Sequence, residues 1–427
     1  MDLRKEIKLS DLLPKRGKKE AADEQPVAEE TPAEEKPAKE KRSFSFARKP
    51  KEPSAPKEPK QPKAKKPKTS KERRPVLHKK LVGLKIGASQ LAAARVVNNG
   101  TAEVVQLARM DLEPGIVVGG ELREPEALAA ALKTFFRDNK LPRQSVRLGI
   151  ASNRIGVRMF ELGGIDDPKQ LENAIRFRAQ EALPIPLEEA VLDYQILGES
   201  VDDEGQKKHR VLLVVAYRDL VDRYVGACKK AGIKLAGVDL EAFALLRALG
   251  EPPAEGASAA IVVASVGSDR STLAVSNGEV CEFTRVIEWG GQNLNVAIAR
   301  SLDMTPSEAE PIKLSLNLLE PAEAMELDPE RAARVRTAVS EELQAFAREL
   351  VSSLQFYQGQ PGSLGIAEIV LTGGTAQMPG LDAELARLIG VRIRMGDPLS
   401  RVERGKKVGD DHALGSLAVA IGLGIES

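Results

Sequence analysis

The chain has 427 residues and a formal net charge of +1, and this near-zero sum conceals an uneven distribution. Residues 1–80 carry 25 Lys and Arg against 14 Asp and Glu, a net of +11, which leaves residues 81–427 with a net of −10. The sequence has no apolar run of 18 residues and no apolar core near its start, so we expect neither a membrane-spanning helix nor a secretory signal. With only two cysteines, Cys228 and Cys281, and three histidines, we also expect neither a disulfide framework nor a His/Cys metal site.

Residues 15–79 are predicted to be a disordered linker, because they are rich in Lys, Glu, Pro and Ala and nearly lack large apolar residues. Its charges are segregated: residues 20–40 hold eight acids against two lysines, and residues 41–80 hold sixteen bases against three acids. The linker is interpreted as a solvated spacer or as a tether from residues 41–80 to an anionic membrane surface. Nucleic-acid binding is less favoured, because Phe44 and Phe46 are the only aromatic residues there.

A short apolar cluster precedes the linker, in the sequence IKLSDLLPKR. Short apolar segments at the end of a disordered arm often dock into a groove on a folded domain. The cluster, residues 1–14, is therefore a candidate docking motif. The residues assigned to the motif are Ile7, Leu9, Leu12, Leu13 and Pro14.

From residue 80 the pattern changes to strands and amphipathic helices. For example, Leu128, Leu132, Phe135 and Phe136 make an apolar stripe at helical spacing. We expect strands at 81–87, 91–97, 101–112, 145–151, 155–162, 190–197, 210–217 and 234–238, and helices at 125–139, 167–182, 219–231 and 240–249.

A second half begins after the Pro- and Gly-rich residues 251–258 and repeats the opening arrangement. Residues 259–289 read as strand, glycine turn and strand, followed by a turn at Asn277–Gly278 and a third strand. This internal duplication points to two related α/β domains, at 80–250 and 257–427. Further along we expect a helix at about 330–357, a strand, glycine turn and helix start at 366–381, a strand at 391–396 and a helix at 414–424.

Three glycine turns follow strands and are candidate anion-binding loops, since glycine lets the backbone N–H groups approach a ligand closely. They suggest a nucleotide cleft between the two halves, although the chain has neither a Walker motif nor a dinucleotide motif. The turns are Gly87-Ala88-Ser89, Gly267-Ser268 and Gly373-Gly374-Thr375.

The body resembles the PilM family of type IV pilus assembly proteins, which have an actin-like fold. The resemblance covers about residues 80–427. The segments that carry it are LVGLKIGASQ (81–90), ENAIRFRAQEALPIPLEEAVLDYQIL (172–197), AYRDLVDRYVGACKKAGIKLAGVDLEAFALLRAL (216–249), EWGGQNLNVAIAR (288–300), SSLQFYQGQPG (352–362) and IVLTGGTAQMPGLDAELARLIGVRIRMGDP (369–398).

The resemblance implies an actin-like α/β fold of two domains around an ATP cleft, with a small α+β subdomain inserted at about 145–217. It also implies a cytoplasmic adaptor whose groove, formed with the inserted subdomain, binds the N-terminal tail of a PilN-type inner-membrane protein. ATP is the implied cofactor, with or without magnesium.

The chain departs from the family pattern at two acids. The first phosphate loop usually begins Asp-x-Gly, and here Lys85 stands in the acidic position, while Ala92 replaces a lysine that follows. The second loop usually has an acid two residues before its glycine, and here that residue is Ser265, with Asp269 nearby in the turn. Because magnesium needs hard oxygen ligands, we expect weak or absent hydrolysis, and assign no catalytic residue and no metal ligand. A scaffold with an empty cleft, and static nucleotide binding in which Lys85 neutralises a phosphate, both remain open.

The tip is similar to the Ile-Asn-Leu-Leu-Pro motif of PilN tails, with Asp11 in place of asparagine. Residues 7–14 are therefore a candidate for occupying the groove, in the same molecule or in a neighbour, although a leucine pair before proline is a common sequence. Two other functions stay open. One is an actin-superfamily ATPase or sugar kinase, which the missing acids argue against. The other is a cell-division-type membrane tether, a class of protein that would usually carry a C-terminal amphipathic helix.

Overall fold

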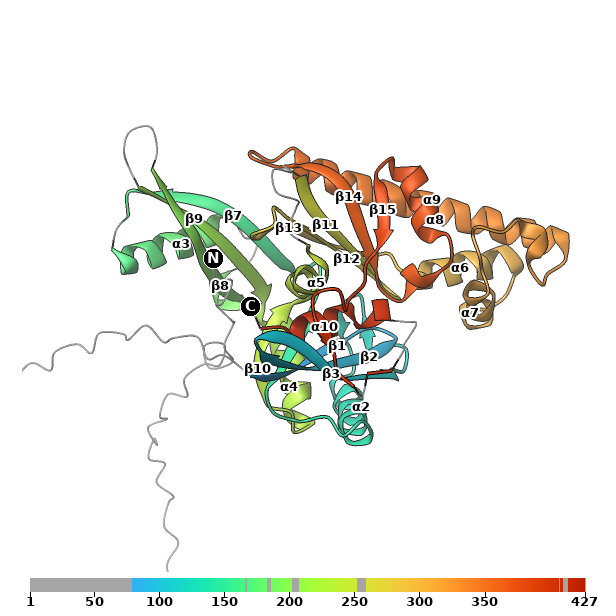
Figure 1. Ribbon diagram of the computed structural model, residues 1–427, viewed down its shortest axis with the longest axis horizontal. Coiled ribbons are helices and arrows are strands. Elements are labelled where there is room, and N and C mark those ends of the chain that lie inside the picture. The colour runs from blue at the N-terminus through green and yellow to red at the C-terminus, as the bar shows by residue number, and fades with distance from the viewer. Residues whose placement is uncertain are drawn as a thin grey trace, which may run out of the picture. The chain divides into compact units, whose positions relative to one another are not determined.

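The computed structural model describes residues 79–165, 167–182, 186–201, 207–251, 259–406, 408–409 and 414–426 (Figure 1). The docking-motif candidate and the linker, apart from residue 79, lie outside these ranges. Among the helices so described, none is long and apolar enough to cross a membrane.

The first sheet has six strands in the order β10-β6-β1-β2-β3-β16. Strands β1, β2 and β3 are antiparallel neighbours, whereas β6 lies parallel to both β1 and β10. The strands span Lys80–Ile86 (β1), Gln90–Asn99 (β2), Thr101–Asp111 (β3), Val146–Ile150 (β6), Leu235–Leu240 (β10) and Glu403–Arg404 (β16).

Both faces of this sheet are covered, which explains why β2 reads as a continuous apolar run rather than an alternating one. Leu91 and Ala93 of β2 belong to a core shared with helices α2 (Pro125–Asp138) and α4 (Arg218–Lys230). The alternate residues Ala92, Ala94 and Val96 face a second core that includes the C-terminal helix.

The second sheet has five strands in the order β13-β12-β11-β14-β15 and repeats the antiparallel hairpin of the first. Its core is covered by α6, α8 and α9, through residues such as Leu294, Phe346 and Leu381. The elements are β11 (Ala259–Val266), β12 (Ser271–Ser276), β13 (Cys281–Ile287), β14 (Gly365–Thr372), β15 (Arg392–Met395), α6 (Gly291–Leu302), α7 (Pro306–Leu314), α8 (Pro329–Gln358) and α9 (Leu381–Ile389).

A separate three-stranded sheet, β7-β9-β8, is built from the inserted segment. It is formed by β7 (Ile155–Gly163), β8 (Ala190–Val201) and β9 (Lys207–Tyr217), with α3 (Pro168–Ala182) packed on one face. Along β9, Val211 and Leu213 face α3, whereas Leu212 and Val214 belong to the core of the first domain. The independent sheet thus begins at Ile155, since Val146–Ile150, inside the segment assigned to the insertion, is a strand of the first sheet.

The end of the chain returns to the first sheet. Strand β16 pairs with β3, and helix α10 (Ala418–Gly424) contacts β1, β2 and α5 (Glu241–Leu249). The approach of α10 is close: a Cβ on Gly422 would overlap the Ala244 carbonyl, and one on Gly83 would overlap the Ala420 carbonyl. The small apolar residues of 414–424 predict a helix, of which residues 414–417 form a 3-10 turn and 418–424 the α-helix, but they do not reveal this return to the first sheet.

Most predicted elements are confirmed to within a few residues, including all the strands expected in both sheets. Helices α6 and α7, strand β16 and the short ribbon β4–β5 were not among the predicted ranges, and all of them except α6 are short and carry little periodicity. The remaining short elements are β4 (Val117–Val118), β5 (Glu121–Leu122) and the 3-10 turns η1 (Leu187–Glu189), η2 (Ala322–Ala324), η3 (Thr375–Gln377) and η4 (Leu414–Leu417).

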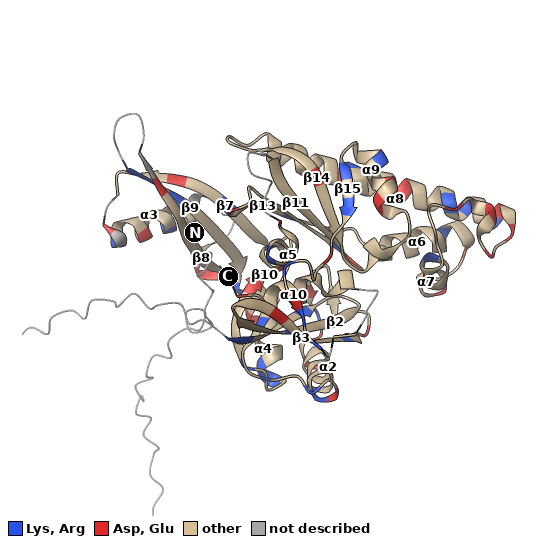
Figure 2. Ribbon diagram, viewed as in Figure 1, with Lys and Arg blue, Asp and Glu red and all other residues tan. Residues whose placement is uncertain are grey.

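Charged residues of both signs are interspersed along α8 and α9 (Figure 2). Several form exposed ion pairs, such as Arg387 with Glu384 at 2.7 Å. Pairs of this kind add little to stability. The fold therefore depends mainly on its apolar cores and on the close helix contacts described above.

Two helical glycines give a matched test of the α10 contact. Gly422→Ala should lower the free energy of unfolding by about 1–3 kcal/mol, because the added methyl group has no room against the α5 backbone. Gly226→Ala in α4 should raise it by about 0.5–1 kcal/mol, because a methyl group there would meet no other atom within 4 Å. Urea unfolding of both variants measures the difference, and equal effects would contradict the close packing.

Candidate functional site

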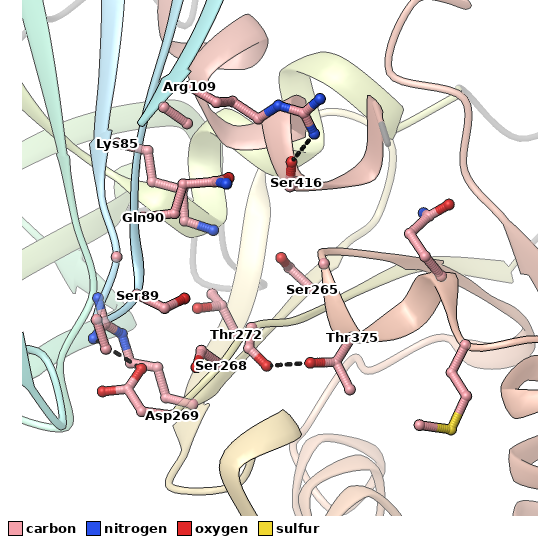
Figure 3. A pocket seen from close by; sticks show the side chains of 18 of the residues that line it. Lys85, Ser89, Gln90, Arg109, Ser265, Ser268, Asp269, Thr272, Thr375 and Ser416 are labelled. Atoms are coloured by element: carbon pink, nitrogen blue, oxygen red, sulfur yellow. Dashed lines mark hydrogen bonds and ion pairs between the residues drawn. The ribbon is translucent and has the colours of Figure 1, made fainter. Parts of the chain in front are cut away.

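A cavity of about 440 Å³ brings all three glycine turns together (Figure 3). The first turn comes from the first sheet, and the other two come from the second sheet. Nine of the ten residues predicted for this site line the cavity: Lys85, Gly87, Ala88, Ser89, Ser265, Gly267, Ser268, Gly374 and Thr375. Gly373 does not line it.

The first two turns are the same structure repeated. The N–H of Gly87 donates to the Gln90 carbonyl at 2.9 Å, and the N–H of Gly267 donates to the Arg270 carbonyl at 3.0 Å. A side chain on Gly267 would come within 2.8 Å of that carbonyl, so the turn requires glycine. The duplication seen in the sequence therefore places two equivalent tight turns on the cavity wall.

The third turn is tied to the second. Gly373 has φ +106°, and a Cβ there would overlap the Val266 carbonyl at the end of β11. The Thr375 hydroxyl donates to the Gly267 carbonyl at 2.6 Å. Gly373 is thus a structural residue that holds Gly374 and Thr375 against the second turn.

A chain of charged side chains crosses the cavity wall. Lys85 Nζ lies 4.0 Å from Glu241 Oε2, and Arg270 Nη2 lies 3.8 Å from Glu241 Oε1. Glu241 and Arg270 are buried, whereas the Lys85 side chain is 16% exposed. Burial lowers the pKa of Arg270, but the carboxylates of Glu241 and Asp269 outweigh it, so this pKa is raised above its ordinary value.

Asp269 joins the two halves of the body. Its Oδ2 accepts a hydrogen bond from the backbone N–H of Gly119 at 2.8 Å, and its Oδ1 lies 3.5 Å from Arg270 Nη1. The sequence indicates only that this residue lies in the second turn. In the structure its carboxylate is held by a donor of the first half and by the neighbouring arginine.

Sequence reasoning missed several charged residues of the cavity. Arg109 donates to the Ser416 hydroxyl at 3.2 Å, which links β3 to the segment before α10. Glu310 and Lys313 of α7 pair at 3.5 Å and also line the cavity. Among the charged cavity residues that were missed, only Glu241 has a sequence feature that could have indicated it: it is an acid directly after strand β10 and at the start of α5.

The cavity does not fit a magnesium ion held by protein carboxylates. Its lining contains three, Glu241, Asp269 and Glu310, and each already has a cationic partner within 4.0 Å. Within the described ranges, no group of three acidic, His or Cys side chains could hold a metal. Magnesium at a phosphate site keeps several waters and uses one or two protein carboxylates, and each carboxylate here would first have to leave a cationic partner.

A second cavity, of about 320 Å³, lies where the inserted sheet meets both halves, and we call it the insert groove. Tyr194 and Leu212 line it from the three-stranded sheet, Phe243 and Leu246 from α5, and Val280 from the β12–β13 turn. Charged residues stand beside this apolar lining: Arg147, Asp193, Asp239, Arg247, Glu279, Arg401 and Glu426.

Comparison with known proteins gives consistent results along the body. The model of the family described as type IV pilus assembly protein PilM matches residues 83–427. A solved structure described as a PilM–PilN type IV pilus biogenesis complex aligns with a TM-score of 0.67 and 25% identity, covering 81% of this chain and 97% of that chain. The actin-like α/β two-domain fold expected from the sequence is thereby confirmed.

Curated relatives include the cell division protein FtsA. The protein of Escherichia coli K12 is 25% identical over 362 residues, which covers 75% of this chain and 85% of the relative. The protein of Bacillus subtilis 168 is 21% identical over 351 residues, which covers 74% and 78%.

Proposed function

Because the chain belongs to the family of type IV pilus assembly proteins PilM, we propose that it is an adaptor that holds the N-terminal tail of a PilN-type inner-membrane protein. The family match over residues 83–427 carries this proposal. Its place would be at the cytoplasmic face of the inner membrane, where it would connect the membrane part of a pilus or related machine to cytoplasmic components.

The insert groove is our candidate for the tail-binding site. It combines apolar side chains, which suit a leucine pair, with charged groups at its edges, which suit the polar residues of a tail. Phe243 and Tyr194 contribute aromatic surface, and aromatic residues often dominate binding energy at such sites. The groove also includes strands of the inserted sheet, as the family resemblance implies.

The chain's own tip is a second occupant to consider for the same groove. Residues 7–14 carry four large apolar side chains before a proline, and the linker of residues 15–79 separates them from the body in the sequence. We propose that the tip competes with the partner tail or connects neighbouring copies of the protein.

The basic half of the linker fits a location near the membrane. Residues 41–80 carry a net charge of +13. Each Lys or Arg near an anionic surface is worth about 1 kcal/mol of attraction, which falls off over a Debye length. We therefore propose that these residues contact anionic lipid headgroups while the body holds the partner tail.

The first cavity is our candidate nucleotide site. Its three glycine turns meet around about 440 Å³, which lies within the usual range for small-ligand sites. Hydrolysis of ATP would require a metal and a positioned water, and the engaged carboxylates do not offer a metal site. We propose that ATP binds there and that hydrolysis is weak or absent.

The similarity to FtsA supports a second candidate, an actin-like tether with a different client. That similarity is 25% in identity, whereas the PilM family model matches nearly the whole body. The adaptor of a pilus machine is therefore the better-supported function.

The groove can be tested with two matched phenylalanine variants. Phe243→Ala should weaken binding of a PilN-type tail peptide about tenfold or more, because it removes an apolar wall of the groove. Phe177→Ala on α3 should leave affinity unchanged, since Phe177 is 62% exposed and does not line the groove. Fluorescence anisotropy of the labelled peptide measures both, and equal effects would argue against this groove.

The tip can be tested in the full chain. Leu12→Ser with Leu13→Ser should raise the affinity for the tail peptide several-fold, because it removes a competitor for the groove. Phe44→Ser with Phe46→Ser is the control, since these residues lie in the linker outside the tip. A labelled peptide of residues 1–18 should also bind the tip variant, and a lack of saturable binding would rule the tip out.

Hydrolysis can be tested by phosphate release. Because each carboxylate of the cavity is paired with a cation, turnover of ATP in magnesium should be weak or stay at the level of the buffer. Adding EDTA should therefore change nothing. Metal-dependent turnover that scales with protein concentration would show that the site hydrolyses ATP.

A further inference from the structure

We propose that the cleft takes a polyphosphate as the metal-free anion, with the Lys85 ammonium in the role that a divalent cation plays elsewhere. This inference rests on the proposed nucleotide function and adds the charge state of the ligand. It assigns Lys85 as the residue that selects that state. Three independent features of the cavity support it: its charge, the state of its carboxylates and the position of Lys85.

The cavity lining carries more cations than anions. Lys85, Arg109, Arg270 and Lys313 line it, against Glu241, Asp269 and Glu310. Divalent metal bound to a phosphate chain reduces the negative charge that such a lining attracts. A net positive lining of side chains therefore favours the free polyphosphate over its metal complex.

The carboxylates are occupied by protein groups. Glu241 has two cations within 4.0 Å, Asp269 accepts the Gly119 N–H and faces Arg270, and Glu310 pairs with Lys313. A magnesium ion would have to displace one of these partners. If Arg270 were displaced from its carboxylate, it would become a buried cation without a counter-ion, because it is only 6% exposed.

Two buried atoms of this network lack hydrogen bonds. Glu241 Oε1 and Arg270 Nη1 have no hydrogen-bond partner within the described part of the chain, although both residues are more than nine-tenths buried. Such atoms are costly unless a ligand or water satisfies them. Both residues line the cavity. Only Arg270 Nη1 is a donor that a phosphate oxygen can satisfy, whereas Glu241 Oε1 is an acceptor that needs a donor such as water.

Lys85 is placed to move between two anions. Its Nζ is 4.0 Å from Glu241, beyond hydrogen-bonding distance, so charge alone holds the pair. It stands two residues before Gly87, at the end of β1. Its neighbour across the β1–β2 ladder is Ala92, whose small side chain also lines the cavity and leaves the lysine room to extend. On binding, the ammonium would turn to the phosphate while Arg270 remains near Glu241.

The test is calorimetric titration of the full chain with ATP, in EDTA and in magnesium chloride. Binding should persist in EDTA and should not tighten when magnesium is added. Lys85→Ala should weaken binding in EDTA about ten- to hundredfold, the value of a charge-assisted hydrogen bond. Lys85→Arg should restore most of the affinity, and Lys133→Ala, an exposed lysine of α2, should have no effect.

Charge reversal gives the sharpest contrast. Lys85→Asp should abolish binding in EDTA and make the remaining binding depend on magnesium, because it supplies the missing carboxylate.

Thermal melting checks that each variant is folded, and Lys85→Met, which keeps the side-chain volume, replaces Lys85→Ala if the latter unfolds. Inorganic tripolyphosphate is titrated in parallel and should bind more weakly than ATP.

The outcomes separate the two proposals. No binding of ATP under either condition, or equal binding of ATP and tripolyphosphate, would contradict the nucleotide function itself. Binding of the wild-type chain only in magnesium, or unchanged affinity of Lys85→Ala in EDTA, would overturn the metal-free inference and leave nucleotide binding standing.

Discussion

The contact between α10 and α5 is the constraint on which the two cavities depend. The two helices approach with no side chain between them at Gly422, and α10 lies equally close to β1 at Gly83. The same contact belongs to a core that also includes Val263 of β11 and Val370 of β14. A helix from the end of the chain therefore fixes the spacing between the first and second sheets, and with it the width of the space between their glycine turns.

The C-terminal segment is anchored by charge as well as by packing. Arg147 of β6 donates to the carbonyls of Leu423 and Ile425 and pairs with Glu426 at 3.0 Å. Burial lowers the pKa of this arginine, because its environment disfavours the charged form. A buried guanidinium is tolerated here because carbonyl and carboxylate oxygens satisfy it. The anchor keeps the last residues of the described chain at the edge of the insert groove.

The local elements could be predicted from the sequence, but their long-range partners could not. Apolar strand-like runs and glycine turns located both hairpins, so Gly87 and Gly267 were expected on one cavity and are found there. The partner of Asp269 is Gly119, 150 positions away, and no periodicity encodes such a pairing. Glu241 was missed for the same reason, since its importance depends on Lys85 and Arg270, which approach it only in the folded chain.

Four segments line both cavities, so neither site is structurally independent. Helix α5 contributes Glu241 to the first cavity and Phe243 to the insert groove. Strand β11 contributes Ser265 to the first cavity and Ile261 to the groove, and strand β12 contributes Thr272 and Ser276, respectively. The C-terminal segment adds Ser416 to the first cavity and Glu426 to the groove. Because α5 lines both cavities within nine residues, its position sets one wall of each of them.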